Sequence, residues 1–147
     1  MTYLQRAPMI IVYDLEQAVA ALAIANLCKR PVMLRSPEST SAAMGPAVFV
    51  EIAKAARASN PKRFAGAIFD CGSQAGLAIA AIRNGNCDII IDTACKTSEK
   101  IKRLARAYKI NALDKSMLND TAPSVLDLKD ATNISPMVEK FLVHTNL

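Results

Sequence analysis

The fold is decided by the stretch Ala67-Ile68-Phe69-Asp70-Cys71-Gly72-Ser73-Gln74-Ala75-Gly76. Its first three residues are apolar, and a second apolar run, Leu77 to Ile82, begins directly after Gly76. This pattern predicts a buried strand that passes through a polar, glycine-containing turn into a helix. In α/β proteins ligands bind at such turns, because the carboxyl ends of strands and the N-termini of helices meet there.

The same order of strand, polar turn and helix recurs along the chain. Apolar strands are predicted at residues 9–13, 32–34, 67–69 and 89–91, with a short fifth strand at 110–113. Helices are predicted over 15–29, over 46–58, from 77 to about 84 and over 96–109. Asp14 is placed to cap the first helix, Ser73 the third, and Thr97 or Ser98 the fourth. Continuous Ile/Val strands that alternate with helices are typical of a parallel sheet.

A chain of 147 residues is long enough to bury a core as one domain. We therefore predict a single three-layer α/β domain, with a parallel sheet of about five strands and helices on both faces. The alternative is half of a (βα) barrel that dimerises. In this prediction residues 1–115 form the α/β domain. Residues 116–147 form a C-terminal arm and a short helix begun by Ser135-Pro136, packed on the domain or on a partner subunit.

The first predicted helix is apolar on nearly all of its faces, so it needs cover on two sides. The sheet provides one side. The other side is a neighbouring helix, the C-terminal tail or a second subunit, and a homodimer is the expected oligomer. Within the tail, residues 124–128 are either a strand or an extended arm.

Composition excludes several classes of function. No apolar run reaches the ~20 residues that cross a bilayer, and the N-terminus lacks the pattern of a signal peptide. Four cysteines without CxxC spacing and a single histidine predict no metal site. Neither GxGxxG nor GxxxxGK[ST] occurs, so ATP and NAD are not indicated and no cofactor is expected. We expect a cytoplasmic protein with reduced thiols, without contact to a membrane.

The net charge of +5 is concentrated in one segment. Residues 96–109 contain six basic side chains and one acidic side chain, so the rest of the chain is neutral. Such a patch gives phosphate affinity. However, its basic residues are not interleaved with aromatic, Asn or Gln side chains that contact bases, since Tyr108 belongs to the apolar stripe of the predicted helix. We therefore expect this basic surface to face solvent or to bind an acidic partner, and we do not expect it to bind nucleic acid.

Parallel strands place their carboxyl ends at one edge of a sheet, and polar residues follow every predicted strand. Arg35 can bind a carboxylate or phosphate through two hydrogen bonds, and Lys96 offers a point charge or an amine. Asp14 and Asp114 belong to the same edge. Helix capping is the alternative role for Asp14, Asp70 and Asp92. The predicted ligand-binding set is Arg35, Ser36, Asp70, Cys71, Gly72, Ser73, Gln74, Asp92, Thr93 and Lys96.

Residues 82–92, Ile-Arg-Asn-Gly-Asn-Cys-Asp-Ile-Ile-Ile-Asp, resemble the helix-to-strand passage of aldolase-type (βα) barrels. The same stretch, together with Phe69-Asp70-Cys71-Gly72 and Leu126-Asp127-Leu128, also resembles short uncharacterised bacterial α/β proteins. The first resemblance implies that Met9 to Asp114 form about half of a barrel. Barrels of that type place a Schiff-base lysine or a phosphate loop at the strand ends, whereas here Lys96 lies past the strand and Lys115 follows the short fifth strand.

The sequence thus favours a protein that binds a small polar or anionic ligand at the strand carboxyl ends. Two alternatives stay open. One is a lyase or aldolase that uses Lys96 as the amine, with Asp70 or Asp92 as acid and base. The other is a structural subunit that oligomerises through its first helix and its tail.

Overall fold

A computed structural model describes residues 7–38, 44–92, 94, 96–121 and 125–145. Its centre is a parallel sheet in the order β5-β4-β3-β2-β1-β6. The strands are β1 (Met9–Ile11), β2 (Val32–Arg35), β3 (Phe64–Asp70), β4 (Asp88–Ile91), β5 (Ala112–Asp114) and β6 (Val125–Asp127). The predicted parallel α/β sheet is confirmed. It has six strands rather than about five, because Val125–Asp127 pair with β1.

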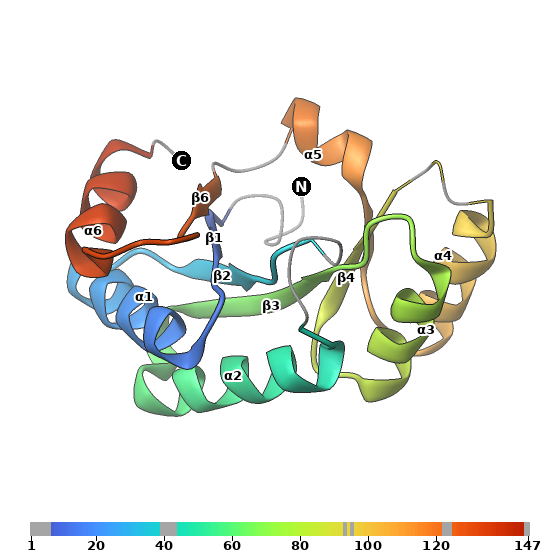
Figure 1. The fold of residues 1–147 in the computed structure, drawn as a ribbon, viewed down its shortest axis with the longest axis horizontal. Helices are drawn as coiled ribbons and strands as arrows, with labels where there is room; N and C mark the ends of the chain where they lie inside the picture. The colour runs from blue at the N-terminus through green and yellow to red at the C-terminus, as the bar shows by residue number, and fades with distance from the viewer. Residues whose placement is uncertain (1–6, 39–43, 93, 95, 122–124, 146–147) are drawn as a thin grey trace.

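Most of the helix layer lies on one face of the sheet (Figure 1). It consists of α1 (Leu15–Cys28), α2 (Pro46–Ser59), α3 (Ala75–Asn84), α4 (Ser98–Ala107) and α6 (Ile134–His144), with the short 3-10 helix η2 (Pro61–Arg63) after α2. The short α5 (Lys115–Thr121) packs against the opposite face through Leu118. Helices therefore occur on both faces, but their uneven distribution fits the half-barrel alternative.

Alternation along the strands explains the two faces. Ile10, Leu34 and Phe69 point toward the helix layer and are fully buried there. Their neighbours Met9 and Met33, with Ile68 and Ile90, form a second buried cluster on the face toward α5. Side chains on both faces are apolar, which is why these strands read as continuous hydrophobic runs.

The direction of the crossovers explains why α5 changes face. From β1 to β5 the chain moves across the sheet in one direction, with its helices on one side. From β5 it returns past all the other strands to β6. A right-handed crossover in the reverse direction has to pass over the opposite face, where α5 lies.

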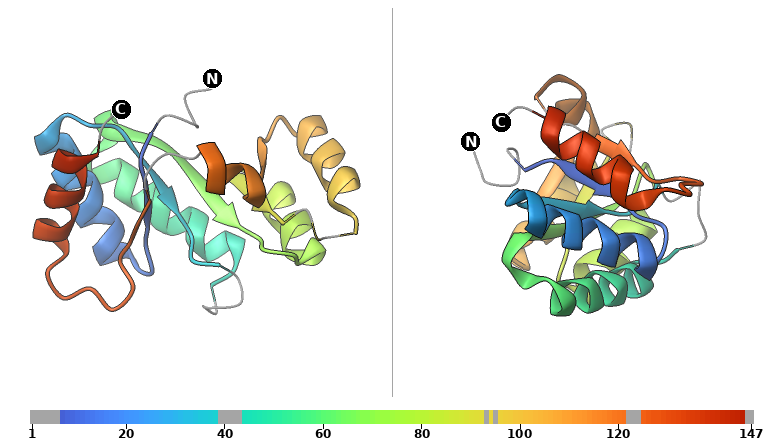
Figure 2. Two further views of the ribbon diagram at one scale, coloured as in Figure 1. Left: turned by 90° about the horizontal axis from the view of Figure 1, so that it is seen from above. Right: turned by 90° about the vertical axis from the view of Figure 1, so that its left-hand side faces the viewer.

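The apolar helix α1 is covered by α2 on one flank and by α6 on the other (Figures 1 and 2). Hydrogen bonds hold the C-terminal segment to it. Gln17 Nε2 donates to the carbonyl of Leu128 at 2.8 Å. The Arg30 guanidinium donates to the carbonyls of Leu142 and Thr145 at 2.8 and 2.9 Å. The second side of α1 is thus covered within the chain.

Two of the expected helix starts are wrong by one or two residues. The N-cap of α3 is Gln74, not Ser73, because a turn closed by the Gln74 N–H to the Cys71 carbonyl places Ser73 inside it. Helix α6 begins after Asn133, so Pro136 lies within its first turn, where its missing N–H costs nothing. Asp14 and Thr97 are N-caps as predicted, and Asp14 accepts a hydrogen bond from Gln17 N at 2.8 Å.

Candidate functional site

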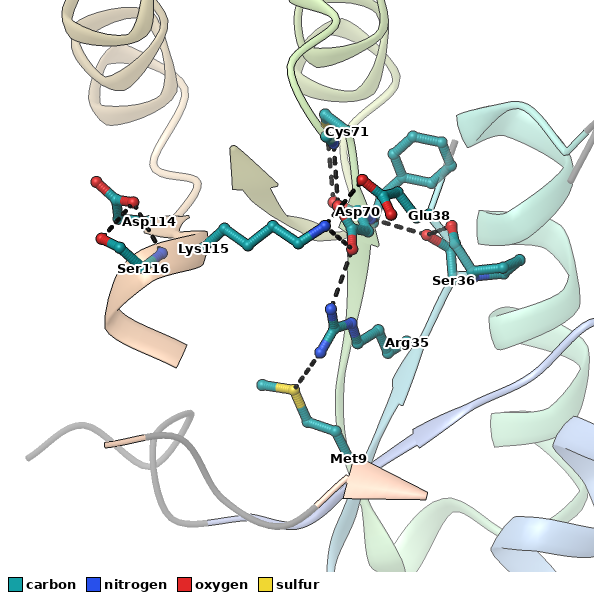
Figure 3. Close-up of polar contacts among 12 residues, drawn as sticks. Met9, Arg35, Ser36, Glu38, Asp70, Cys71, Asp114, Lys115 and Ser116 are labelled. Carbon is teal, nitrogen blue, oxygen red and sulfur yellow. Dashed lines mark hydrogen bonds and ion pairs between the residues drawn. The ribbon is translucent and has the colours of Figure 1, made fainter. Parts of the chain in front are cut away.

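Asp70, the last residue of β3, is the centre of a polar cluster at the carboxyl ends of the strands (Figure 3). Its side chain is only 1% exposed. Oδ2 accepts a hydrogen bond from Arg35 Nη2 at 3.0 Å and lies 3.7 Å from Lys115 Nζ. Oδ1 accepts from the backbone N–H of Gly72, two residues further on, at 3.0 Å.

The strands determine which side chains meet there. Arg35 ends β2 and Asp70 ends the neighbouring strand β3, and both alternate onto the face of Met9 and Ile68. Ser36 connects the two strand ends, because its Oγ accepts from Asp70 N at 2.8 Å and donates to the Pro37 carbonyl at 3.1 Å. Ser36 is fully buried, so this contact positions the backbone beneath the cluster.

The cluster balances two cations against two anions. Lys115, at the start of α5, forms a 2.9 Å ion pair with Glu38 in addition to its contact with Asp70. Arg35 is 12% exposed and Lys115 is 29% exposed. Both cations are thus partly reachable from solvent, whereas the carboxylate between them is not.

Arg35 has donors that this cluster does not use. Nη1 has the Met9 sulfur at 4.0 Å, and a thioether is a weak acceptor. Nε is buried and has no hydrogen-bond partner among the residues that the structure describes. A guanidinium presents five N–H donors, so part of its capacity is open to a further acceptor.

Other members of the predicted set lie around this cluster. Ser73 and Gln74 are exposed in the turn before α3. Asp92 is half-buried and accepts from Ala94 N at 3.0 Å, while its own N–H donates to the Gly72 carbonyl at 2.9 Å. Lys96 is exposed, and none of its described contacts joins it to Asp70 or Asp92. Thr93 lies outside the described residues.

Cys71 points away from the cluster into the core beneath the helices. Burial raises its pKa to about 12, and the nearby charges of Asp70 and Cys87 add to the shift. The thiol therefore stays protonated at neutral pH. Its backbone N–H donates to the Ile90 carbonyl at 2.9 Å, which extends the pairing of β3 with β4 up to the site.

Asp114 ends β5 at the predicted edge, but alternation turns its side chain toward α4 and away from the cluster. Lys102 Nζ lies 3.5 Å from its Oδ2, and Ser116 donates to its Oδ1 through both N–H and hydroxyl. Burial alone raises the pKa of Asp114, but the Ser116 hydrogen bonds and the Lys102 charge outweigh it and lower the pKa overall.

Lys115 and Glu38 belong to the cluster, although neither is in the predicted ligand-binding set. A signal for Lys115 was present, since it directly follows the predicted fifth strand. Its partner could not be predicted without the strand order. That order also creates a point where the chain diverges: after β4 it turns to α4 on one face, and after β5 to α5 on the other. Ligands of open α/β sheets bind beside such divergent strand ends.

Within the described residues, no group of three or more His, Cys, Asp or Glu side chains is arranged to hold a metal ion. The search for long apolar helices, made over the same residues, found none that could span a membrane.

Known proteins resemble this chain in fold. No family model matches it, and no curated protein does. A putative fructose-1,6-biphosphate aldolase from Coccidioides immitis matches 74% of the chain with a TM-score of 0.58 and 18% identity. The YdjI aldolase from Escherichia coli K12 matches 82% with a TM-score of 0.62 and 11% identity. The chain spans 40% and 54% of these two structures, respectively. By its fold, the protein is therefore an α/β chain that is similar to part of an aldolase-type barrel.

Proposed function

We propose that the protein binds a small polar or anionic ligand at the carboxyl ends of β2, β3 and β5. The observation that carries this proposal is the state of Arg35. Its guanidinium is largely buried, yet among the described residues only Nη2 has a strong acceptor. Leaving a buried donor unsatisfied costs about 1–3 kcal/mol, so an acceptor that completes it gains affinity.

The chemistry around Arg35 favours a carboxylate or a phosphate. Arg35 supplies planar donors, and Lys115 supplies a second cation within the same cluster. Asp70 holds both cations in place and accepts from Gly72. We include the exposed Ser73, Gln74 and Lys96 as residues at the rim of the proposed site, with Asp92 and Thr93 after the neighbouring strand.

Thermal shift and calorimetric titration with acetate, pyruvate, citrate and inorganic phosphate test this proposal. At least one of these anions should stabilise the protein. Arg35→Lys keeps the positive charge but removes the paired N–H donors of the guanidinium, and we expect it to weaken binding about 10-fold or more. Arg83→Lys, an exposed arginine on α3, is the matched control. Wild-type affinity in Arg35→Lys and in Asp70→Ala would overturn the proposal.

A second candidate is a lyase or aldolase reaction, favoured by the fold of the two structural neighbours. Lys96, with Asp70 or Asp92, was the predicted pair. The amine that lies beside Asp70 is instead Lys115, at 3.7 Å. Lys115 is held between two carboxylates, with Nζ 2.9 Å from Glu38 and 3.7 Å from Asp70, so its contacts are those of an ion-pair partner. The geometry therefore supports binding better than covalent catalysis.

Borohydride trapping separates the two candidates. If an amine attacks the carbonyl carbon of a keto acid, one water leaves and an imine forms. Borohydride then adds hydride and leaves a stable secondary amine on that lysine. Peptide mass spectrometry of protein treated with pyruvate and borohydride should show no adduct on Lys96 or Lys115 if binding alone is correct. An adduct that disappears in Lys115→Arg would establish the lyase candidate instead.

A cytoplasmic location is part of the same proposal. Within the part of the chain that the structure describes, Cys28 and Cys87 are free thiols. Disulfides are rare in the reducing cytosol, and free thiols fit that compartment.

A further inference from the structure

Helix α4 presents a row of basic side chains to solvent. Lys100, Arg103 and Arg106 follow one another at a spacing of three residues, which places them along one side of the helix. All three are exposed, whereas Ile101 and Ala105 on the other side are buried in the core. We call these three residues the α4 stripe. It is about 9 Å long at the helical rise of 1.5 Å per residue.

The α4 stripe has no acidic counterpart in the part of the chain that the structure describes. The neighbouring Lys102 is the basic residue of α4 that is neutralised, by Glu99 at 3.6 Å and Asp114 at 3.5 Å. None of the described ion pairs reaches Lys100, Arg103 or Arg106. The positive charge of the segment therefore stays uncompensated at this surface.

The position of α4 leaves the stripe accessible. Figure 1 shows α4 at the end of the helix layer, beside α3 and on the opposite side of the molecule from α6. Figure 2 shows the same arrangement from above. The Arg35 cluster lies on the other face of the sheet, toward α5. A ligand on α4 would thus be separate from one bound at Arg35.

We propose that the α4 stripe binds the phosphate backbone of a nucleic acid without reading its sequence. Helix α4 itself, Ser98–Ala107, contains no aromatic, Asn or Gln side chain. This argues against base contacts only, since backbone binding requires none. An acidic protein is the less suitable partner. Stable protein interfaces need a buried apolar or aromatic centre, and the stripe itself contains only Lys and Arg.

Fluorescence anisotropy with a labelled oligothymidylate of about 20 nucleotides tests the proposal. Neutralising three phosphates on a single strand, one for each residue of the stripe, predicts a slope of about −2 in log K against log salt. The affinity should therefore fall roughly 20-fold between about 50 and 200 mM NaCl. The triple variant Lys100→Ala, Arg103→Ala, Arg106→Ala should lose at least about 10-fold in affinity at the lower salt. Alanine preserves the helix at exposed positions.

The matched control is Lys62→Ala, Lys129→Ala, Lys140→Ala, which removes three exposed charges outside α4. It should retain most of the wild-type affinity. An equal loss in both triple variants would show that net charge alone causes binding, and would overturn the proposal. Competition by poly-glutamate as strong as by unlabelled oligothymidylate would overturn it in favour of an acidic partner. Anion binding at Arg35 should be unchanged in either triple variant.

Discussion

At the residue scale, Asp70 connects the fold to the candidate site. Its N–H bonds to Ser36, its Oδ1 to Gly72, and its Oδ2 faces both Arg35 and Lys115. Removing one partner of a buried ion pair leaves the other charge uncompensated. The resulting loss of stability is larger than the stability that the intact pair contributes. We consequently expect the loss of Asp70 to lower stability as well as the proposed affinity for anions.

Asp70→Asn should destabilise the protein by about 3 kcal/mol, because the nearly isosteric amide leaves Arg35 and Lys115 without their central anion. Urea unfolding at neutral pH measures this change. Asp92→Asn is the control, since among the described residues its carboxylate accepts from the exposed Ala94 N–H alone, and it should cost less than about 1 kcal/mol. Equal destabilisation by the two variants would contradict a central role for Asp70.

The two buried thiols predict a loss of stability at alkaline pH. Burial raises the pKa of Cys71 and of Cys87 to about 12, above the ordinary value of 9.0. Between these two pH values only the unfolded chain releases the thiol protons. The stabilisation is therefore complete below pH 9 and falls as the pH rises toward 12, by up to about 1.4 kcal/mol per pH unit for each thiol.

Urea midpoints measured from pH 8 to 10.5 check this prediction. Cys71→Ala should lose stability less steeply with pH than the wild type, whatever its stability at pH 8. Cys28→Ala, which removes a half-buried thiol, serves as the comparison. The same slope in Cys71→Ala and in wild type would show that Cys71 titrates normally in the folded protein.

At the scale of elements, the contact between α1 and α6 closes one flank of the domain. Gln17 accepts from Tyr13 N at 2.8 Å and donates to the Leu128 carbonyl, so one buried amide joins β1, α1 and the end of β6. Arg30 binds carbonyls at the C-terminal end of α6. A cation at this position satisfies carbonyl groups that have no partner within the helix.

Arg30→Met should loosen α6 while leaving the sheet intact. It removes two hydrogen bonds to carbonyls and keeps an unbranched apolar side chain, so we expect a loss of about 1–3 kcal/mol. Hydrogen exchange should accelerate for the amides of α6 and stay slow for those of β2 and β3. Arg83→Met on α3 provides the exposed control. Unchanged exchange in α6 would show that apolar packing alone holds this helix.

At the scale of the whole molecule, the chain forms an open sheet with two edges, whereas a closed barrel has none. On the helix side, an apolar groove of about 410 Å³ between α1 and α2 is lined mainly by Leu15, Ala47, Val48, Ile52 and Ala55. Leu15 and Val48 are 45% and 57% exposed. Exposed apolar surface of this kind is a common mark of an interface.

We expect a second copy of the chain to cover this groove and form a homodimer. Sedimentation velocity across micromolar concentrations should show a concentration-dependent dimer for the wild type. Val48→Glu should shift it to monomer, because a carboxylate would be buried without a partner. Leu27→Glu, an exposed position outside the groove, should not. A monomer at all concentrations would contradict the expectation.

Local sequence patterns determined the elements and the edge where a site belongs. Continuous apolar runs such as Ile89-Ile90-Ile91 require burial on both faces, and this requirement produces a parallel sheet with alternating helices. Polar residues that end these runs are placed at one edge by the same periodicity. For this reason Arg35 and Asp70 could be predicted to lie at a common edge of the sheet from sequence alone.

Only the tertiary structure decided which strand ends are neighbours and which way each side chain points. Strand order brings β5 into the same sheet, and the return crossover starts α5 with Lys115 facing Asp70. Because successive side chains of a strand point to opposite faces of the sheet, Cys71 and Asp114 point toward the helices instead. These outcomes depend on contacts between residues more than 30 positions apart, such as Arg35 with Asp70. Periodicity within a segment cannot specify such contacts, because they are selected by the packing of the whole sheet.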